Sequence, residues 1–458
     1  MSLSDQLLSI IEEACADVFV QKRVQVRAAE LILGTLCAMG RRTISRSICA
    51  LGRQDQDWSA DYKLYSRSPW ETQGLFEPVL KDYGRRYPQG PIVIALDDTK
   101  LSKTGRKIES AFWQRDPLSP PFHVNLMYGL RFMQASLIFP HYRDGDHSAR
   151  ALPVRFVECP AIKKPGKNAS EGQIKAYRKA ARERNLPAQG LEVMKELRTS
   201  PDRLGEENHP ILFAVDGSLC NRTIFKAQLD RVDLVARCRK DARLCFPAPP
   251  GARRKYGLER FSPEGIRKDE SICWAKADIH YGGGWRSIRY KEVKGVLWQR
   301  GAGLRALRLL VVAPQPYKIS PNSRTNYRQP AYLLTTDIGS SAVVVLQAYF
   351  DRWQIEVNHR EEKDTLGVGQ AQVRSAQSVP RHPAFAVASY SMLLLAGLKS
   401  FGPGRPDNFM VLPKWRKSAR RASALDLITL LRVEVNETRS SEALRGKIAR
   451  NIVPYACA

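Results

Sequence analysis

Two short apolar runs, each ending in acidic residues, constrain the fold of this chain more than any other feature. The first run, Pro91–Leu96, is followed by Asp97 and Asp98, and the second, Ile211–Val215, is followed by Asp216. Unbroken apolar runs of this length are typical of strands that are buried on both faces of a sheet. The two runs therefore predict a mixed α/β protein whose central sheet carries acidic side chains at the ends of two strands.

Side chains alternate between the two faces of a strand, so only one of the neighbouring acids can face a shared site. Asp98 lies on the same face as Leu96, and Asp97 lies on the opposite face. The alternation does not say which face holds the site. It therefore leaves both acids as candidates.

Residues 340–363 predict a long helix, which Ser340 or Ser341 can cap and Gly367 can end. At about 100° per residue, four polar side chains fall on one side of this helix: Tyr349, Arg352, Glu356 and Lys363. An adjoining stripe holds the apolar residues that are expected to pack against a core: Phe350, Trp353 and Val357.

Ordinary ion pairs on a solvated helix face would also account for the charged residues of the polar stripe. Their spacing, Tyr-x2-Arg-x3-Glu-x6-Lys, resembles the YREK signature of insertion-sequence DDE transposases. This resemblance implies a ribonuclease-H-like catalytic domain in which Glu356 is the third metal-binding carboxylate. It also implies that Tyr349, Arg352 and Lys363 hold the DNA at the end of the transposon.

The same resemblance implies that two aspartates complete the metal-binding set. The family pattern places its first catalytic Asp directly before a Thr, which selects Asp98 here and keeps Asp97 as the alternative. Asp216 is the expected second aspartate, although Asp-Gly is also a common turn sequence. A pair of Mg²⁺ ions, with Mn²⁺ as a substitute, is the expected cofactor, because hard ions prefer carboxylate oxygens. The nine cysteines and seven histidines lie scattered, without the spacing of a structural zinc site.

The chain of 458 residues is long enough for several domains. About 140 residues separate Asp216 from Glu356, far more than one connection needs, and family members carry a β insertion between these two acids. The expected domains are a helical DNA-binding domain at 1–90, a ribonuclease-H-like catalytic domain at 91–234 and 336–380, a β-rich insertion at 235–335, and a C-terminal helical region at 381–458. For residues 1–90, a plain helical bundle with a basic surface is the alternative to a DNA-binding domain.

Three further residues are candidates for DNA contact. Lys103 belongs to a basic loop after the first strand, where it either meets phosphates or is simply solvated. In the insertion, Trp298 lies beside Arg300, which could hold a phosphate. Related transposases that form hairpinned ends stack a flipped base on a Trp of the insertion, so the resemblance implies this role for Trp298. A place in the core is the alternative for this side chain.

Residues 160–208 are rich in polar and charged side chains. A helix is expected near Gln173–Arg184, with four basic residues on one face: Lys175, Arg178, Lys179 and Arg182. This face either contacts a DNA backbone or is a solvated helix surface.

The charge of the chain points to a polyanionic partner. Lys and Arg number 73 against 46 Asp and Glu, which gives a net charge of +27 and a pI near 9.9. Nucleic acid is the first candidate, and the transposase resemblance implies double-stranded DNA, as terminal inverted repeats and as target, bound by a homodimer. An anionic membrane is the rival, but no apolar run of about 18 residues and no signal peptide is present. We therefore expect no membrane contact and a cytoplasmic, DNA-associated protein.

Taken together, these patterns predict a transposase that binds terminal inverted repeats and catalyses metal-dependent DNA cleavage and strand transfer. Two alternatives remain open at this point. One is a domesticated transposase that only binds DNA, and the other is a different ribonuclease-H-like nuclease.

Overall fold

The computed structural model describes residues 2–86, 90–116, 118–120, 122–143, 147–203, 209–320, 322–406, 409 and 419–440. Within the predicted C-terminal helical region at 381–458, residues 407–408, 410–418 and 441–458 lie outside these residues.

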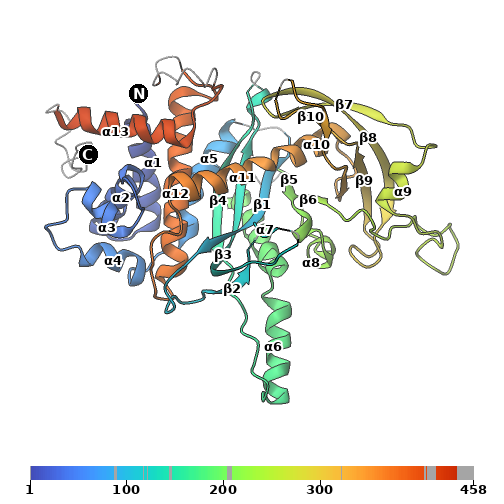
Figure 1. Ribbon diagram of the computed structural model, residues 1–458, viewed down its shortest axis with the longest axis horizontal. Coiled ribbons are helices and arrows are strands. Elements are labelled where there is room, and N and C mark those ends of the chain that lie inside the picture. Colours follow the sequence, from blue (N-terminus) through green and yellow to red (C-terminus); the bar gives the residue numbers. More distant parts are fainter. Residues whose placement is uncertain are drawn as a thin grey trace.

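Five strands form the centre of one mixed sheet (Figure 1). In chain order they are β1 (Ile92–Ser102), β3 (Leu126–Phe139), β4 (Arg150–Glu158), β5 (Ile211–Val215) and β6 (Val232–Arg237). Their order across the sheet is β4-β3-β1-β5-β6. The strand β3 is antiparallel to both β1 and β4, whereas β5 and β6 run parallel to β1. This is the strand arrangement of a ribonuclease-H-like core within a mixed α/β protein, as predicted.

The strands of the predicted insertion continue the same sheet. They are β7 (Ala275–Tyr281), β8 (Gly284–Leu297), β9 (Ala306–Val312) and β12 (Ala331–Thr335). Beyond β6 the order is β12-β9-β8-β7, with antiparallel neighbours throughout. The insertion region therefore widens the central sheet and shares its backbone hydrogen-bond network. The short strand β2 (Phe112–Arg115) pairs with β3, and β10 (Pro316–Tyr317) pairs with β11 (Asn326–Tyr327).

Helices cover both faces of the sheet. On one face lies α7 (Leu186–Arg203), where Gly190 comes close to Leu96 and Met133. On the other face lie α10 (Ala342–Asp351) and α11 (Trp353–Arg360), where Ile355 packs in one cluster with Ala95 of β1. A π-helical turn, η4 (Glu361–Thr365), follows α11 directly.

The N-terminal helices are α1 (Leu3–Val18), α2 (Lys22–Cys37), α3 (Ile44–Ala50), α4 (Ser59–Ser66), η1 (Thr72–Phe76) and α5 (Glu77–Arg86). They pack against α12 (Ser378–Phe401) and α13 (Ala424–Ser440), and the backbone amide of Ser4 donates a hydrogen bond to Glu434 at 2.7 Å. Residues far apart in the sequence thus form one helical layer with a shared core.

By length and composition alone, the 24-residue helix α12 could cross a membrane. Its most apolar window is 83% buried inside the protein, however, as is usual for the central helix of a packed core.

Candidate active site

Asp97 and Asp216 lie side by side at one edge of the sheet. The parallel strands β1 and β5 pair Leu96 with Val215. Asp97 directly follows Leu96, and Asp216 directly follows Val215, so the two half-buried acids are level with each other where β5 ends. The strand register thus brings together the acids that follow the two apolar runs.

Asp97, rather than Asp98, faces the helix that carries Glu356. Ala95 packs in one cluster with Ile355 of α11, and alternation along β1 puts Asp97 on the same face as Ala95. The family pattern selects Asp98 for this place. Because α11 packs on the Ala95 side of the strand, that choice of face is corrected here, and Asp98 lies on the opposite face.

Asp98 is already engaged within the sheet. Its Oδ2 accepts a hydrogen bond of 2.7 Å from Nε of Arg131, which belongs to β3. Its backbone amide donates to Oδ1 of Asp97 at 2.8 Å. The charge of Asp98 is therefore balanced by an ion pair on the α7 side of the sheet.

Arg352 lies between Asp97 and Glu356 and is only 8% exposed. Its Nη2 donates to Oε1 of Glu356 at 2.9 Å, and its Nη1 is 3.9 Å from Oδ2 of Asp97. Its Cζ is 5.9 Å from the ring centre of Tyr349. Within the described residues, Nε and Nη1 of this guanidinium have no hydrogen-bond partner. Arg352 therefore has hydrogen-bond donors at the centre of the cluster that could bind a ligand.

Burial at the cluster makes negative charge on Asp97 costly. Burial is the main reason that the pKa of Asp97 is raised from 3.8 to about 7, and the charges of Asp98 and Asp216 act in the same direction. Arg352 opposes this rise. Burial also raises the pKa of the Tyr349 hydroxyl. A partly desolvated group of acids with a perturbed pKa is typical of functional sites, and it favours the binding of cations.

Lys363 completes the predicted polar stripe from the π-helical turn. Burial lowers the pKa of Lys363, and Asp97 and Asp98 are among the neighbouring acids that oppose this effect. Arg352 and Lys363 of the stripe therefore lie near Asp97, and Glu356 and Tyr349 contact Arg352. A π turn inserts one extra residue into a helix and occurs often at functional sites.

Glu362 belongs to this neighbourhood, although the sequence analysis does not single it out. It is 1% exposed, and its Oε1 accepts a hydrogen bond of 2.9 Å from Nε2 of Gln134. Gln134 is the β3 residue that pairs with Asp97. Burial raises the pKa of Glu362 to about 8. Because Glu362 lies in a run of charged residues, the sequence predicts a solvated helix end there and does not predict that Glu362 is buried.

Lys103 is buried, whereas the sequence predicts that it lies in a basic loop that either meets phosphates or is solvated. It is 4% exposed, and its Nζ donates to the backbone carbonyls of Gly369 and Ala371 at 2.6 and 2.7 Å. The strand β1 continues to Ser102, so Lys103 lies at a strand end that the chain segment after η4 covers. Its ammonium group therefore holds that segment against the sheet.

One tryptophan differs from the sequence expectation, and a second one follows one of its two alternatives. Trp353, expected in a core-packing stripe, is 55% exposed, because the helix turns Arg352 and Ile355 toward the sheet instead. Trp298 is half-buried, and its ring lies edge-on to Phe225 with centres 5.6 Å apart. This packing favours the core alternative for Trp298. The neighbouring Arg300 is exposed.

The acids fit a hard divalent ion in kind, but their present arrangement does not enclose one. Asp97, Asp216 and Glu356 offer carboxylate oxygens, which Mg²⁺ and Mn²⁺ prefer. Among the residues that the structure describes, no three acidic, histidine or cysteine side chains stand close enough to hold an ion together. In this arrangement the carboxylate of Glu356 is paired with the guanidinium of Arg352.

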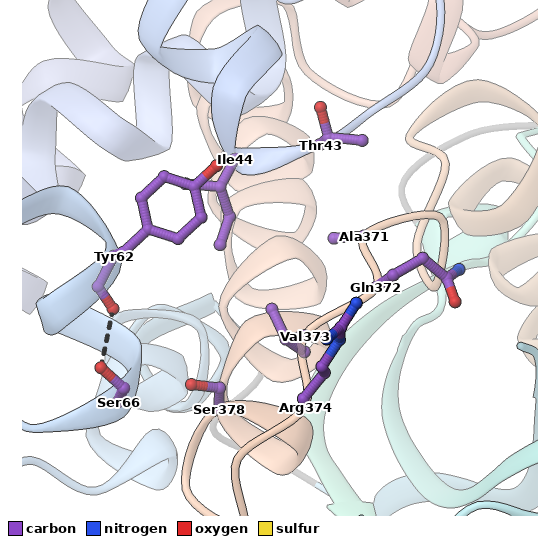
Figure 2. A pocket seen from close by; sticks show the side chains of 9 residues that line it. All are labelled: Thr43, Ile44, Tyr62, Ser66, Ala371, Gln372, Val373, Arg374 and Ser378. Atoms are coloured by element: carbon purple, nitrogen blue, oxygen red, sulfur yellow. Dashed lines mark hydrogen bonds between the residues drawn. The ribbon is translucent and has the colours of Figure 1, made fainter. Parts of the chain in front are cut away.

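A cavity of about 320 Å³ lies elsewhere, between the N-terminal helices and the segment that follows η4 (Figure 2). Tyr62 and Ser66 of α4 line one side, and Gln372 and Arg374 line the other. None of the clustered acids lines this cavity. It is therefore separate from the candidate active site.

Comparison with known proteins adds little. No family model matches the chain, and no curated protein matches it. Among solved structures, the chain is similar to a cryo-EM structure of the piggyBac transposase synaptic complex with hairpin DNA. The sequences are 12% identical, the match covers 95% of this chain and 77% of that one, and the TM-score is 0.33. A TM-score this low carries no argument about function, which therefore has to come from the site itself.

Proposed function

We propose that this protein is a DDE-type transposase, an enzyme that cuts and joins DNA with the help of divalent metal ions. The observation that carries the proposal is the meeting of Asp97 with Asp216 on neighbouring parallel strands, beneath the helix that bears Glu356. Three carboxylates from two strands and one helix of a ribonuclease-H-like sheet are the set implied by the YREK-like spacing.

The chemistry requires these residues in distinct roles. Asp97, Asp216 and Glu356 would hold the metal ions, with Mg²⁺ the expected species. The bound ions would activate a water or a 3′-hydroxyl as nucleophile and would neutralise charge on the leaving oxygen. Arg352 offers planar donors that suit a phosphate in a bidentate contact, and Lys363 offers a point charge. Tyr349 supports the guanidinium of Arg352 from its ring face.

Metal binding by three carboxylates requires Glu356 to leave Arg352. A DNA phosphate is a suitable replacement partner for Arg352. It can accept a hydrogen bond from Nη2, which now binds Glu356, and from Nε and Nη1, which have no partner among the described residues. We therefore expect the DNA backbone to engage Arg352 and release Glu356 toward Asp97.

The whole chain supports DNA as the substrate. Its net charge of +27 favours a polyanion, and phosphate contacts dominate the affinity of proteins for DNA. In this proposal, terminal inverted repeats and target DNA are both bound by a homodimer in the cytoplasm, without membrane contact. The reaction is cleavage at the element ends followed by strand transfer.

A protein that only binds DNA is the second candidate. The environment of Asp97 argues against it, because a buried acid with its pKa raised to about 7 destabilises the fold at neutral pH. A purely DNA-binding protein gains nothing from such a group. Another ribonuclease-H-like nuclease would share the acids but has no reason to carry the YREK-like stripe.

The test is incubation of the purified protein with labelled DNA that spans the ends of its own element, with Mg²⁺ or EDTA, followed by mapping of the cut ends. We expect metal-dependent cuts at the element ends. Cuts at random positions would favour a general nuclease. Tight binding without cuts in Mg²⁺ or Mn²⁺ would favour the DNA-binding alternative.

A further inference from the structure

A basic helix projects from the protein next to the candidate active site. Residues 160–185 connect β4 to α7, and we call this segment the arm. It contains α6 (Glu171–Glu183), which extends away from the rest of the protein at the bottom of the view in Figure 1. None of the residues of α6 is buried.

The strand pairing shows where the arm is attached. Glu158, the last residue of β4, pairs with Phe132 of β3, and Phe132 pairs with Thr99 of β1. The root of the arm is therefore level with Thr99, two residues beyond Asp97. Neighbouring strands lie about 4.8 Å apart, so the root is roughly 10 Å from β1 across the sheet. The arm therefore leaves the sheet at the carboxyl end of β4, on the side where the carboxyl ends of β1 and β5 hold the clustered acids.

The charge of the arm is concentrated and exposed. Residues 160–185 contain eight basic and two acidic side chains. Four of the basic side chains recur at the i, i+3, i+4 and i+7 spacing that marks one face of a helix: Lys175, Arg178, Lys179 and Arg182. All four are exposed. Among the described residues the only ion pair on this face joins Lys179 to Glu183 at 4.0 Å, and both of its side chains are well exposed.

Among the residues that the structure describes, no element buries a side chain of α6 and so explains its stability. Isolated helices shorter than about 12–15 residues are marginal in water, and α6 has 13 residues. A capping box formed by Ser170 and Gln173 supports its start. Its apolar side chains Ile174 and Tyr177 are only half covered. A partner on the basic face would supply the missing stabilisation.

We propose that the arm is a second DNA-binding element, which lies along the phosphate backbone of the duplex beside the scissile bond. This inference rests on the proposed function, because the scissile bond is that of the transposase reaction. A helix of 13 residues is about 20 Å long, which spans roughly six phosphates of one strand. Four basic side chains on one face can contact several of these phosphates at once.

A second copy of this chain is a poorer partner for the basic face. Each copy carries a net charge of +27, so two copies repel each other at this surface unless DNA lies between them. Duplex DNA offers the opposite charge along a line that matches the length of the helix.

The experiment compares two variants of the full chain. In the first, the basic face is neutralised by Lys175→Gln, Arg178→Gln, Lys179→Gln and Arg182→Gln. In the matched control, the charge is kept by Lys175→Arg, Arg178→Lys, Lys179→Arg and Arg182→Lys. Fluorescence anisotropy measures the affinity of each protein for an end-containing duplex between 50 and 300 mM salt, and hydroxyl-radical footprinting maps the protected sugars.

We expect the glutamine variant to lose about 3–4 from the slope of log affinity against log salt, at roughly 0.9 for each phosphate contact. Its footprint should shorten by roughly six nucleotides beside the cleavage site, while the rest of the footprint remains. The control should keep the slope and footprint of the wild type. The thermal unfolding of both variants should match the wild type, because α6 buries no side chain in the core.

An unchanged slope and footprint in the glutamine variant would overturn the role of the arm, provided the wild type binds and cleaves the DNA. An equal loss in the charge-conserving control would overturn it too, since phosphate contact depends on charge. Loss of dimer formation with unchanged DNA affinity would assign the face to a second copy instead. A wild-type protein without affinity for duplex DNA would overturn the arm and the proposed function together.

Discussion

Replacing Asp97 and Asp98 one at a time by Asn should give opposite effects on stability and on activity. Asp97 is half-buried among like charges, whereas Asp98 forms an ion pair of 2.7 Å with Arg131. We therefore expect Asp97→Asn to be more stable than the wild type and inactive in DNA cleavage. Asp98→Asn should be less stable and still able to cleave.

The magnitude for Asp97 follows from its pKa. The value rises from 3.8 to about 7 in the folded protein, so the folded state binds more protons than the unfolded chain between about pH 4 and pH 7. The free energy of unfolding therefore falls as the pH rises through this range. At about 1.4 kcal/mol per pKa unit, the ionised group costs roughly 4 kcal/mol above pH 7. Asp97→Asn removes this cost, so its advantage is greatest above pH 7 and disappears below about pH 4.

The magnitude for Asp98 follows from its ion pair. The side chains of Asp98 and Arg131 are 13% and 30% exposed, so solvent screens the pair only in part. Hydrogen bonds to charged groups contribute roughly 1.5–3 kcal/mol. Asp98→Asn should lower the free energy of unfolding by about this amount at neutral pH.

The assay is chemical unfolding of the three proteins in EDTA at pH 5 and pH 8, together with nicking of end-containing DNA in Mg²⁺. EDTA keeps metal binding from masking the repulsion between the acids. An Asp97→Asn protein that cleaves like the wild type, beside an inactive but folded Asp98→Asn, would refute the assignment of the site to the α11 face. A lower stability of Asp97→Asn at pH 8 would refute the electrostatic reasoning.

Three further outcomes are expected. Glu356→Gln should abolish cleavage, because the change removes a proposed metal ligand. The affinity for element ends in a gel shift should stay within a few-fold of the wild type, because no phosphate contact is lost. A loss of DNA binding in this variant would contradict the assignment of Glu356 to the metal site. Lys103→Met should lower the free energy of unfolding by about 2–5 kcal/mol, because two buried carbonyls lose their donor, and should leave the salt dependence of DNA binding unchanged. Trp298→Ala should lower the free energy of unfolding, measured in urea, by about 3 kcal/mol, because the ring packs on Phe225. Unchanged stability together with a defect in end processing would instead support base stacking.

The sequence predicts the central strands of the sheet well because their signals are local. The apolar run before Asp97 and the run before Asp216 correspond to β1 and β5, and both acids follow these runs as expected. The spacing around Glu356 likewise predicts a helix with one polar side. Hydrophobic runs and helical periodicity are properties of neighbouring residues, so one sequence is enough to reveal them.

The choice between Asp97 and Asp98 depends on packing between distant segments, which the sequence does not encode locally. Alternation separates the two acids, but the docking of α11 on the Ala95 side decides which of them faces Glu356. Lys103 shows the same limit. Its partners are the carbonyls of Gly369 and Ala371, more than 260 positions away in the sequence. A basic residue in a basic stretch otherwise predicts a solvated loop.

If the protein acts as proposed, the position of Arg352 would link the binding of DNA to the binding of metal. Its Nη2 holds Glu356 at 2.9 Å, while its Nε and Nη1 lack hydrogen-bond partners among the described residues. Buried donors without partners cost about 1–3 kcal/mol each, and a phosphate would satisfy them. Once a phosphate takes the guanidinium, Glu356 is free to join Asp97 as a ligand, so DNA should raise the affinity for metal.

This coupling is reciprocal, because the factor by which DNA raises metal affinity must equal the factor by which metal raises DNA affinity. Couplings of this kind usually amount to about 5–150-fold. Titration calorimetry with Mn²⁺, with and without an uncleavable end duplex, measures the first factor, and anisotropy with and without Mn²⁺ measures the second. In Arg352→Met the restraint on Glu356 is gone, so Mn²⁺ should bind the free protein more tightly and DNA should add little. A wild-type protein that binds Mn²⁺ equally well in both states would show that the ion pair does not control the site.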